Sequence, residues 1–251
     1  MKIWKTVSQV PPLQKDEVHI WRASLRGWLA GEIKRGLNIL SSEEKVRADR
    51  FLQMKHRKRF ITSHAILHAI LMRYLPELWR TPPLQFRYNE YGKPYLAYHF
   101  PLQFNLSNSH SMALYAVARD QKVGIDVEYM QKDTHVNGIA ERFFSPEENA
   151  ALQKLPVEER LAGFYRIWTL KEAYIKAIGY GLSFPLNRFT TNVKAIRMDG
   201  LISVDGNCEQ ATSWALCPVL VGENYEDYKA ALAVERPLKI VHYFDWTASL
   251  L

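Results

Sequence analysis

Two long predicted helices, each bracketed by strand-like segments, constrain the fold of this chain more than any other sequence feature. Residues 60–75 place apolar side chains on one helical stripe, and residues 160–181 form a second predicted helix that Gly179 or Gly181 would close. Strand-like segments surround both helices, at residues 18–25, 84–96, 104–120, 122–130, 188–193, 213–221 and 228–235. The order predicts an α+β fold of two similar halves, residues 1–120 and 121–251, that pack closely because no flexible linker divides them.

Two further helix starts carry capping boxes. Ser41 is followed three residues later by Glu44, and Ser145 by Glu148, so each serine can cap a helix while the glutamate returns to the serine amide. The first of these helices is expected to run through a basic segment, with a break near Met54.

The positive charge of the chain is concentrated in one segment. The chain carries 33 Lys and Arg against 26 Asp and Glu, a net charge of +7. Residues 45–59 hold seven of these cations and one acid, which leaves 26 − 25 = +1 for the rest. A short basic patch favours a compact anionic ligand over nucleic acid, which needs a wider basic face. The alternative is a solvated helix face.

The chain is predicted to be cytoplasmic. Its two cysteines, Cys208 and Cys217, fit neither a metal-binding pair nor a disulfide framework. Polar residues and Pro11-Pro12 interrupt the first segment before it reaches the length of a signal peptide, and no 18-residue apolar stretch exists. We therefore expect no membrane association.

Acidic side chains recur at spacings that suit a metal site. Asp126 and Glu128 alternate along a strand and share one face, while Glu172 and Lys176 are one helical turn apart. Three such carboxylates would suit Mg²⁺, which prefers oxygen ligands. The alternative is that these residues are ordinary surface pairs on an edge strand and an exposed helix.

Five sequence blocks, in order, resemble the signature of the 4′-phosphopantetheinyl transferases. The blocks are SSEEKVRADRF with HRKRF, NEYGKPYL, FNLSNS, GIDVE followed by FFSPEE, and WTLKEAYIK. They span residues 41–185 and are most similar to the longer, surfactin-synthetase-activating (Sfp-type) branch. That resemblance implies two fused halves that form an intramolecular pseudo-dimer in a monomeric chain.

The resemblance also implies an activity and a site. It predicts a holo-[acyl-carrier-protein] synthase that transfers the 4′-phosphopantetheine arm of coenzyme A to a serine of an apo carrier protein and releases 3′,5′-ADP. It implies Mg²⁺ on Asp126, Glu128 and Glu172, with Glu172, or a water it orients, as the base and Lys176 beside the leaving group. The implied phosphate contacts are Arg47, Arg59, Lys93, Ser107, Asn108, Lys171 and Lys176. Asn108 stands where the family usually has a histidine.

The predicted partners are coenzyme A and carrier proteins of fatty-acid, polyketide or nonribosomal-peptide synthesis. Residues 129–142, with Lys132 and Arg142, are the expected docking rim for the carrier. Two other functions remain open from the residues alone. One is a Mg²⁺-dependent nuclease, whose lysine usually follows an acid on the same strand, and the other is a basic nucleic-acid-binding module.

Overall fold

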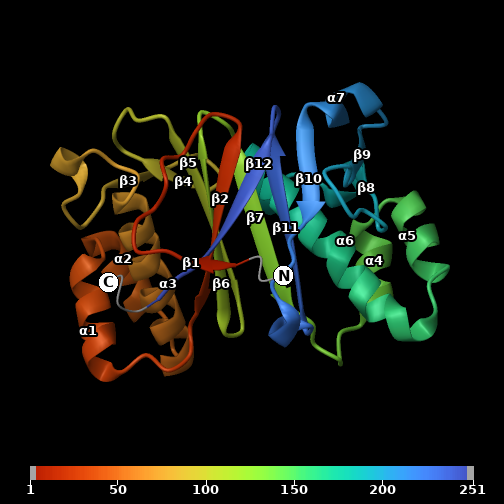
Figure 1. Cartoon of the computed structure of the whole chain (residues 1–251). Helices are drawn as coiled ribbons and strands as arrows, with labels where there is room; N and C mark the ends of the chain where they lie inside the picture. The colour runs from red at the N-terminus through yellow and green to blue at the C-terminus, as the bar shows by residue number, and fades with distance from the viewer. Residues whose placement is uncertain (1–3, 248–251) are drawn as a thin grey trace.

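Strands form the centre of the molecule, and long helices cover them on both sides. The computed structural model describes residues 4–247. Figure 1 shows α1, α2 and α3 on one side of the strands and α4, α5 and α6 on the other. The predicted α+β class is confirmed.

The strands form two main sheets. The first has the order β1-β12-β2-β6-β5, with strands Lys5–Thr6, Ile240–Asp245, Glu17–Ser24, Met112–Arg119 and Leu102–Ser109. The second has the order β10-β11-β7, with strands Trp214–Pro218, Tyr228–Glu235 and Val123–Tyr129. Two small sheets pair β3 (Phe86–Tyr88) with β4 (Pro94–Leu96) and β8 (Phe189–Thr191) with β9 (Leu201–Val204).

Seven α-helices connect the strands within the described residues. They are α1 (Ala30–Ile39), α2 (Ser42–Asp49), α3 (Met54–Met72), α4 (Val136–Phe143), α5 (Pro146–Gln153), α6 (Val157–Ile178) and α7 (Cys208–Thr212). Four short 3₁₀ turns complete the chain, at Glu77–Trp79, Gly181–Ser183, Leu186–Arg188 and Glu223–Tyr225. Both predicted capping boxes are present, and Gly179 closes α6 in the left-handed conformation. The predicted break near Met54 separates α2 from α3.

The helices and the two main sheets stack in the order helix, sheet, sheet, helix, and apolar side chains fill the three spaces between them. Strand residues such as Ile20 and Leu114 of the first sheet meet Ile125 and Leu232 of the second in one core cluster. The opposite face of the first sheet packs on α3, and the opposite face of the second packs on α6. Each sheet therefore has one long helix of its own, and the two sheets bury their remaining faces against each other.

The chain returns to its first sheet at the end. Strand β12, which was not expected from the sequence, pairs in parallel with β2 and β1. The second half, residues 121–251, thus contributes one strand to the sheet of the first half. The division near residue 120 and the pseudo-dimer remain predictions. None of the described helices is both long and apolar enough to cross a bilayer.

Candidate active site

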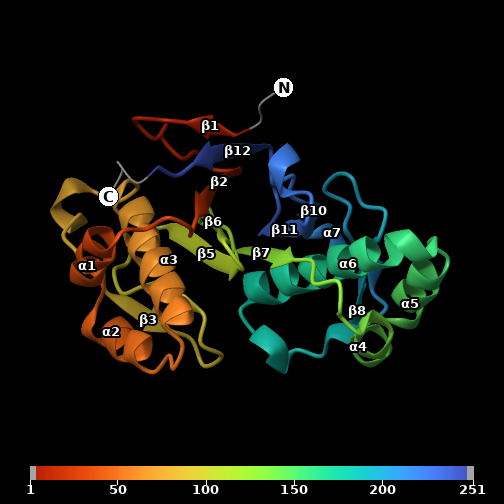
Figure 2. The same cartoon turned by 90° about the horizontal axis from the view of Figure 1, so that it is seen from below.

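A polar pocket lies where the two sheets meet edge to edge. Figure 2 shows β5 of the first sheet and β7 of the second next to each other, between α3 and α6. The pocket has a volume of about 370 Å³ and is lined from α2, α3, the β3–β4 hairpin, β5, β7 and α6. Its lining includes seven of the residues expected from the sequence, Arg47, Ser107, Asn108, Asp126, Glu128, Glu172 and Lys176.

Three carboxylates and one ammonium group converge in this pocket. Asp126 and Glu128 alternate along β7, and Glu172 and Lys176 are one turn apart on α6. The Nζ atom of Lys176 lies 2.6 Å from Asp126 Oδ1. One cation therefore faces three acids, and Lys176 pairs with only the innermost of them.

The pKa values reflect this excess of negative charge. Burial, and then the charge of Asp126, raise the pKa of Glu172 to about 7. The same two causes, in the same order, raise the pKa of Glu128 to about 7. Burial alone would lower the pKa of Lys176, but its bond with Asp126 and the two glutamates raise that pKa above the usual value. Carboxyl groups that resist ionisation near neutral pH are typical of functional sites.

A close contact between α6 and β7 brings the two pairs together. Gly124 lies two residues before Asp126, and a Cβ atom at Gly124 would be 2.1 Å from the carbonyl oxygen of Ala173 and 2.4 Å from the amide nitrogen of Ala177. Only a residue without a side chain fits there. Gly124 thus lets the turn that carries Glu172 and Lys176 approach the strand that carries Asp126.

Side chains of β5 take the place of a neighbouring strand along the free edge of β7. The amides of residues 125, 127 and 129 donate to Asn105 Oδ1, Ser107 Oγ and Ser109 Oγ, at 2.9, 3.3 and 3.1 Å. The Ser107 hydroxyl also donates to Asp126 Oδ1 (2.9 Å), and that of Ser109 donates to Glu128 Oε2 (2.7 Å). Side chains of β5 therefore connect the edges of the two sheets by hydrogen bonds and orient two of the three carboxylates.

The donor set fits a hard divalent cation. All three acids offer oxygen, which is the ligand type that Mg²⁺ prefers. The second oxygen of Asp126, Oδ2, is buried and has no hydrogen-bond partner among the described residues. A buried carboxylate oxygen without a partner is costly, and a cation would satisfy it while relieving the repulsion between the acids.

The other end of the pocket holds a basic residue and a buried acid–histidine cluster. Arg47 lies over the ring of Phe60, 5.4 Å from its centre. Beside it, Glu44 accepts hydrogen bonds from His64 Nδ1 and His68 Nε2, both at 2.8 Å. The Leu84 amide donates to His68 Nδ1, which leaves the proton of the neutral ring on Nε2, where it points to Glu44.

The charge state of this cluster is set by these bonds. Burial alone would raise the pKa of Glu44, but the hydrogen bonds from His64 and His68 bring that pKa well below its usual range. Burial lowers the pKa of His64. His64 lines the pocket, while His68 is fully buried behind it.

Two lysines expected at the phosphates lie elsewhere, so these predictions need correction. Lys171 is fully buried on the opposite side of α6, where its ammonium group pairs with Glu148 at 2.7 Å and donates to two backbone carbonyls. The Nζ atom of Lys93 donates to the carbonyl oxygens of Val123 (3.0 Å) and Ala177 (2.9 Å). Lys93 thus fastens the hairpin turn to β7 and α6, and burial, followed by the charge of Lys122, lowers its pKa to about 8.

Arg59 also lies outside the pocket. It lines a separate basic hollow together with Arg26, Lys55, Lys58 and His110. The prediction of Arg59 as a phosphate contact in the same site is therefore not supported by its position. His110, which stands at the turn after β5 with a positive φ of 50°, stacks on Tyr129 and does not line the pocket.

Several pocket residues were not found from the sequence. Glu44 and His64 belong to different helices, and Asn105 was not assigned a role. Ser109, which lies outside the lining and donates to Glu128, was not assigned one either. One signal was available for the strand: its polar residues 105, 107 and 109 alternate and therefore share a face. Trp168 packs against Phe143 and Phe164.

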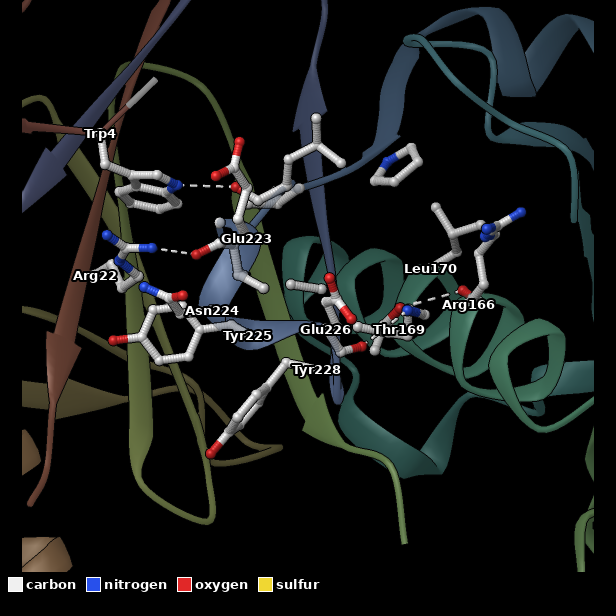
Figure 3. A pocket seen from close by; sticks show the side chains of 17 residues that line it. Trp4, Arg22, Arg166, Thr169, Leu170, Glu223, Asn224, Tyr225, Glu226 and Tyr228 are labelled. Atoms are coloured by element: carbon white, nitrogen blue, oxygen red, sulfur yellow. Dashed lines mark hydrogen bonds between the residues drawn. The ribbon is translucent and has the colours of Figure 1, made fainter. Parts of the chain in front are cut away.

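A larger cavity of about 620 Å³ lies apart from the carboxylates. Figure 3 shows Trp4, Arg22 and Tyr225 on one side of it and Arg166, Thr169 and Leu170 on the other. Arg22 is already engaged there: it pairs with Asp245 at 2.6 Å and lies over both Trp4 and Tyr225. The smaller pocket holds Glu44, Glu128 and Glu172, whose pKa values are strongly shifted, and we take it as the candidate active site.

Comparisons with known proteins identify the family of the chain. A sequence model of the 4′-phosphopantetheinyl transferase superfamily matches residues 122–233, a range that contains all three carboxylates and Lys176. The 4′-phosphopantetheinyl transferase HetI of Nostoc sp. is 40% identical over 174 residues, which are 68% of this chain and 72% of the relative. A 4′-phosphopantetheinyl transferase of Bacillus subtilis is 31% identical over 211 residues, 83% of this chain and 88% of the relative.

The resemblance to the Sfp-type branch is also found. The 4′-phosphopantetheinyl transferase Sfp of Bacillus subtilis (strain 168) is 29% identical over 206 residues, which are 82% of this chain and 87% of the relative. The superfamily model covers β7 to most of β11, with the carboxylates on β7 and α6. The chain is a transferase that belongs to the 4′-phosphopantetheinyl transferase superfamily.

Proposed function

We propose that this chain transfers the 4′-phosphopantetheine arm of coenzyme A to a serine of an apo acyl or peptidyl carrier protein, in the presence of Mg²⁺, and releases 3′,5′-ADP. The observation that carries the proposal is the convergence of Asp126, Glu128 and Glu172 with Lys176 in one pocket. A substrate with a pyrophosphate and a third phosphate needs such a site, because phosphoryl transfer depends mainly on positioning and charge stabilisation.

Each carboxylate has a proposed role. Asp126, Glu128 and Glu172 would hold Mg²⁺, which supplies charge neutralisation for the pyrophosphate when bound. Glu172, or a water that it orients, accepts the proton of the carrier serine. Lys176 stabilises the negative charge that develops on the leaving phosphate.

The opposite end of the pocket would receive the adenosine part of coenzyme A. Arg47 provides a permanent positive charge for the 3′-phosphate, and His64 lies in the same lining. Ser107 and Asn108 lie between the two ends, on the strand that borders the carboxylates. The pocket therefore offers cationic or hydrogen-bonding groups along the length of a phosphate-rich ligand.

Carrier docking and oligomeric state follow from the same arrangement. We propose that the carrier docks on residues 129–142, directly after the strand that carries Glu128, where Lys132 and Arg142 are exposed. Both sheets that border the pocket come from one chain, so a monomer would be complete. The two free thiols, Cys208 and Cys217, suit a cytoplasmic location.

Mass spectrometry of an apo carrier protein tests the reaction. Incubation with this protein, coenzyme A and Mg²⁺ should add about 340 Da, the mass of the transferred arm, to the carrier. Asp126→Ala and Glu172→Ala should each slow transfer by roughly 100-fold or more. Glu128→Gln should be milder, because water can replace one ligand of Mg²⁺.

A matched control lies on the same helix as the proposed base. Glu158 is exposed in the first turn of α6, so Glu158→Ala should transfer at the wild-type rate. An unmodified carrier after incubation with the wild type would contradict the proposal for that carrier class, and wild-type rates in Asp126→Ala would remove the metal assignment. Titration calorimetry with coenzyme A, beside a generic oligonucleotide, separates the transferase from a nuclease or a nucleic-acid-binding module.

A further inference from the structure

Three potential metal ligands meet on the first sheet, away from the active site. Glu17 and His19 alternate along β2 and share a face, and the parallel register places His242 of β12 directly opposite His19. One ligand atom from each of the three residues lies within 4.8 Å of the others. Figure 1 shows β12 beside β2 in this sheet.

The buried ring of His19 has one nitrogen without a partner. His19 is fully buried, and its Nδ1 lies 2.9 Å from the Tyr74 hydroxyl, which also accepts a hydrogen bond from Trp21 Nε1 at 2.8 Å. Its other nitrogen, Nε2, is buried and makes no hydrogen bond among the described residues. Buried polar atoms in proteins are normally satisfied, so this one points to a missing ligand.

The other two side chains open the cluster to solvent. The side chains of Glu17 and His242 are 16% and 35% exposed, and their Oε2 and Nε2 atoms are 3.8 Å apart. The rings of His19 and His242 meet edge to face with centres 5.2 Å apart. A small ion could therefore enter past Glu17 and His242 and reach the nitrogen at the base.

The charges around the cluster are favourable to a cation. Glu17 provides the negative charge, and the charges of the adjacent residue Asp16 and of Lys239 compensate each other in an ion pair of 3.0 Å.

We propose that Glu17, His19 and His242 bind one divalent cation of the imidazole-preferring class, with Zn²⁺ as its representative. Two histidines and a glutamate form a known zinc donor set with a fourth position open to water. Ligand atoms around zinc lie roughly 3.3 Å from one another, so the present atoms, which lie up to 4.8 Å apart, must close by up to about 1.5 Å, which rotation of the two partly exposed side chains allows.

This site differs in chemistry from the carboxylate site. Mg²⁺ prefers oxygen ligands, whereas imidazole favours zinc and its neighbours among the transition metals. The ion would join β12 to β2 across 223 residues of chain (242 − 19). Its expected role is therefore to fasten the last strand of the fold, and the inference does not depend on the proposed transferase reaction.

Zinc titration of the chelator-treated full chain tests the site. We expect one saturable Zn²⁺ site in the wild type and in Asp126→Asn, because the latter alters only the carboxylate pocket. His242→Gln and Glu17→Gln should each weaken binding at least tenfold. The exposed His99 lies outside the cluster, so His99→Gln should bind as the wild type does. Circular dichroism of each variant checks that it is folded.

Visible absorption of bound Co²⁺ and the rise in Tm with Zn²⁺ provide two further tests of the site. Co²⁺ bound at the site should give visible absorption bands that Zn²⁺ abolishes and that His242→Gln lacks. Zn²⁺ at 100-fold above its Kd should raise the Tm of the wild type by about 5 °C or more. Absence of saturable binding, or equal binding in wild type, Glu17→Gln and His242→Gln, would overturn the proposal.

Discussion

At the scale of single residues, the active-site pocket is governed by charges that lack full compensation. Lys176 pairs closely with Asp126, while the pKa values of Glu128 and Glu172 are both raised to about 7. At the other end, Glu44 is a buried carboxylate held by two histidines. Protons and cations therefore compete for the carboxylates at the first end of the pocket. At the second end, the two histidines already compensate the charge of Glu44.

The first prediction concerns magnesium and pH. Because the pKa values of Glu128 and Glu172 are raised in the folded state, these groups favour folding when protonated, and they lose that contribution as pH rises from about 4.5 through 7. Mg²⁺ should replace the lost protons. We expect the Mg²⁺-induced rise in Tm to be larger at pH 8 than at pH 6, as measured by differential scanning fluorimetry. In Glu128→Gln this pH dependence should shrink, and an unchanged rise across pH would argue against the metal assignment.

The second prediction concerns Asn108. It is exposed and lines the pocket, and His110 does not compensate for it because that ring stacks on Tyr129. Asn108→His should strengthen coenzyme A binding by up to about tenfold, since a charged donor bonds phosphate more strongly than an amide. The gain should increase as pH falls through the histidine pKa near 6.5. Calorimetry at two pH values measures it, and weaker binding at the lower pH would show that residue 108 does not face the phosphates.

The third prediction concerns Glu44. Glu44→Gln leaves one histidine donor without an acceptor and should lower the free energy of unfolding by about 2 kcal/mol at pH 7. The folded-state pKa of Glu44 is lowered, so its contribution is present above about pH 4.5 and declines as pH falls below that value. Urea denaturation at pH 7 and at pH 4 measures the difference. The exposed neighbour Glu43 is the control, and Glu43→Gln should be nearly neutral.

At the scale of elements, the site depends on how α6 and β5 meet β7. Helix α6 supplies Glu172 and Lys176, and β5 supplies the side-chain hydrogen bonds that hold the edge of β7. Among the described strands, β5 and β7 are not paired through their backbones. Small side chains therefore control the spacing between the elements that carry the chemistry.

The fourth prediction tests that spacing. Gly124→Ala should push α6 from β7, because its Cβ atom would be 2.1 Å from a backbone oxygen that cannot rotate away. We expect a loss of about 3 kcal/mol in stability and a loss of transfer activity. Gly31 of α1 has open space around its Cβ position, so Gly31→Ala should retain both. Normal activity and stability in Gly124→Ala would contradict the close approach.

At the scale of the whole molecule, one chain supplies every wall of the pocket. Helices α2 and α3 and strand β5 precede residue 120, whereas β7 and α6 follow it. Strand β12 then returns to pair with β2. The chain before and after residue 120 is therefore joined by strand pairing as well as by a shared core.

The fifth prediction follows from this arrangement. The protein should be a monomer by light scattering, because no second copy is needed to complete the pocket. Mixing Arg47→Ala with Asp126→Ala should not restore transfer, since each chain would still carry one damaged end. A stable oligomer in which the mixture regains activity would show that the site is shared between chains.

The sequence by itself determined the features that depend on local periodicity. Alternation along a strand placed Asp126 and Glu128 on one face, and helical spacing placed Glu172 and Lys176 on one stripe. The capping boxes located the starts of α2 and α5. These patterns act over a few residues, so they survive without knowledge of the rest of the fold.

Only the tertiary structure decided which basic groups reach the pocket and which distant residues meet. Lys171 precedes Glu172 by one residue, and the resulting rotation of about 100° around the helix carries it to the buried partner Glu148. Lys93 donates hydrogen bonds to the backbone carbonyl oxygens of Val123 and Ala177, which lie far from it in the sequence. The pairing of His19 with His242 depends on a strand that returns from the far end of the chain. Such contacts are set by how helices and sheets pack, and no local pattern records that packing.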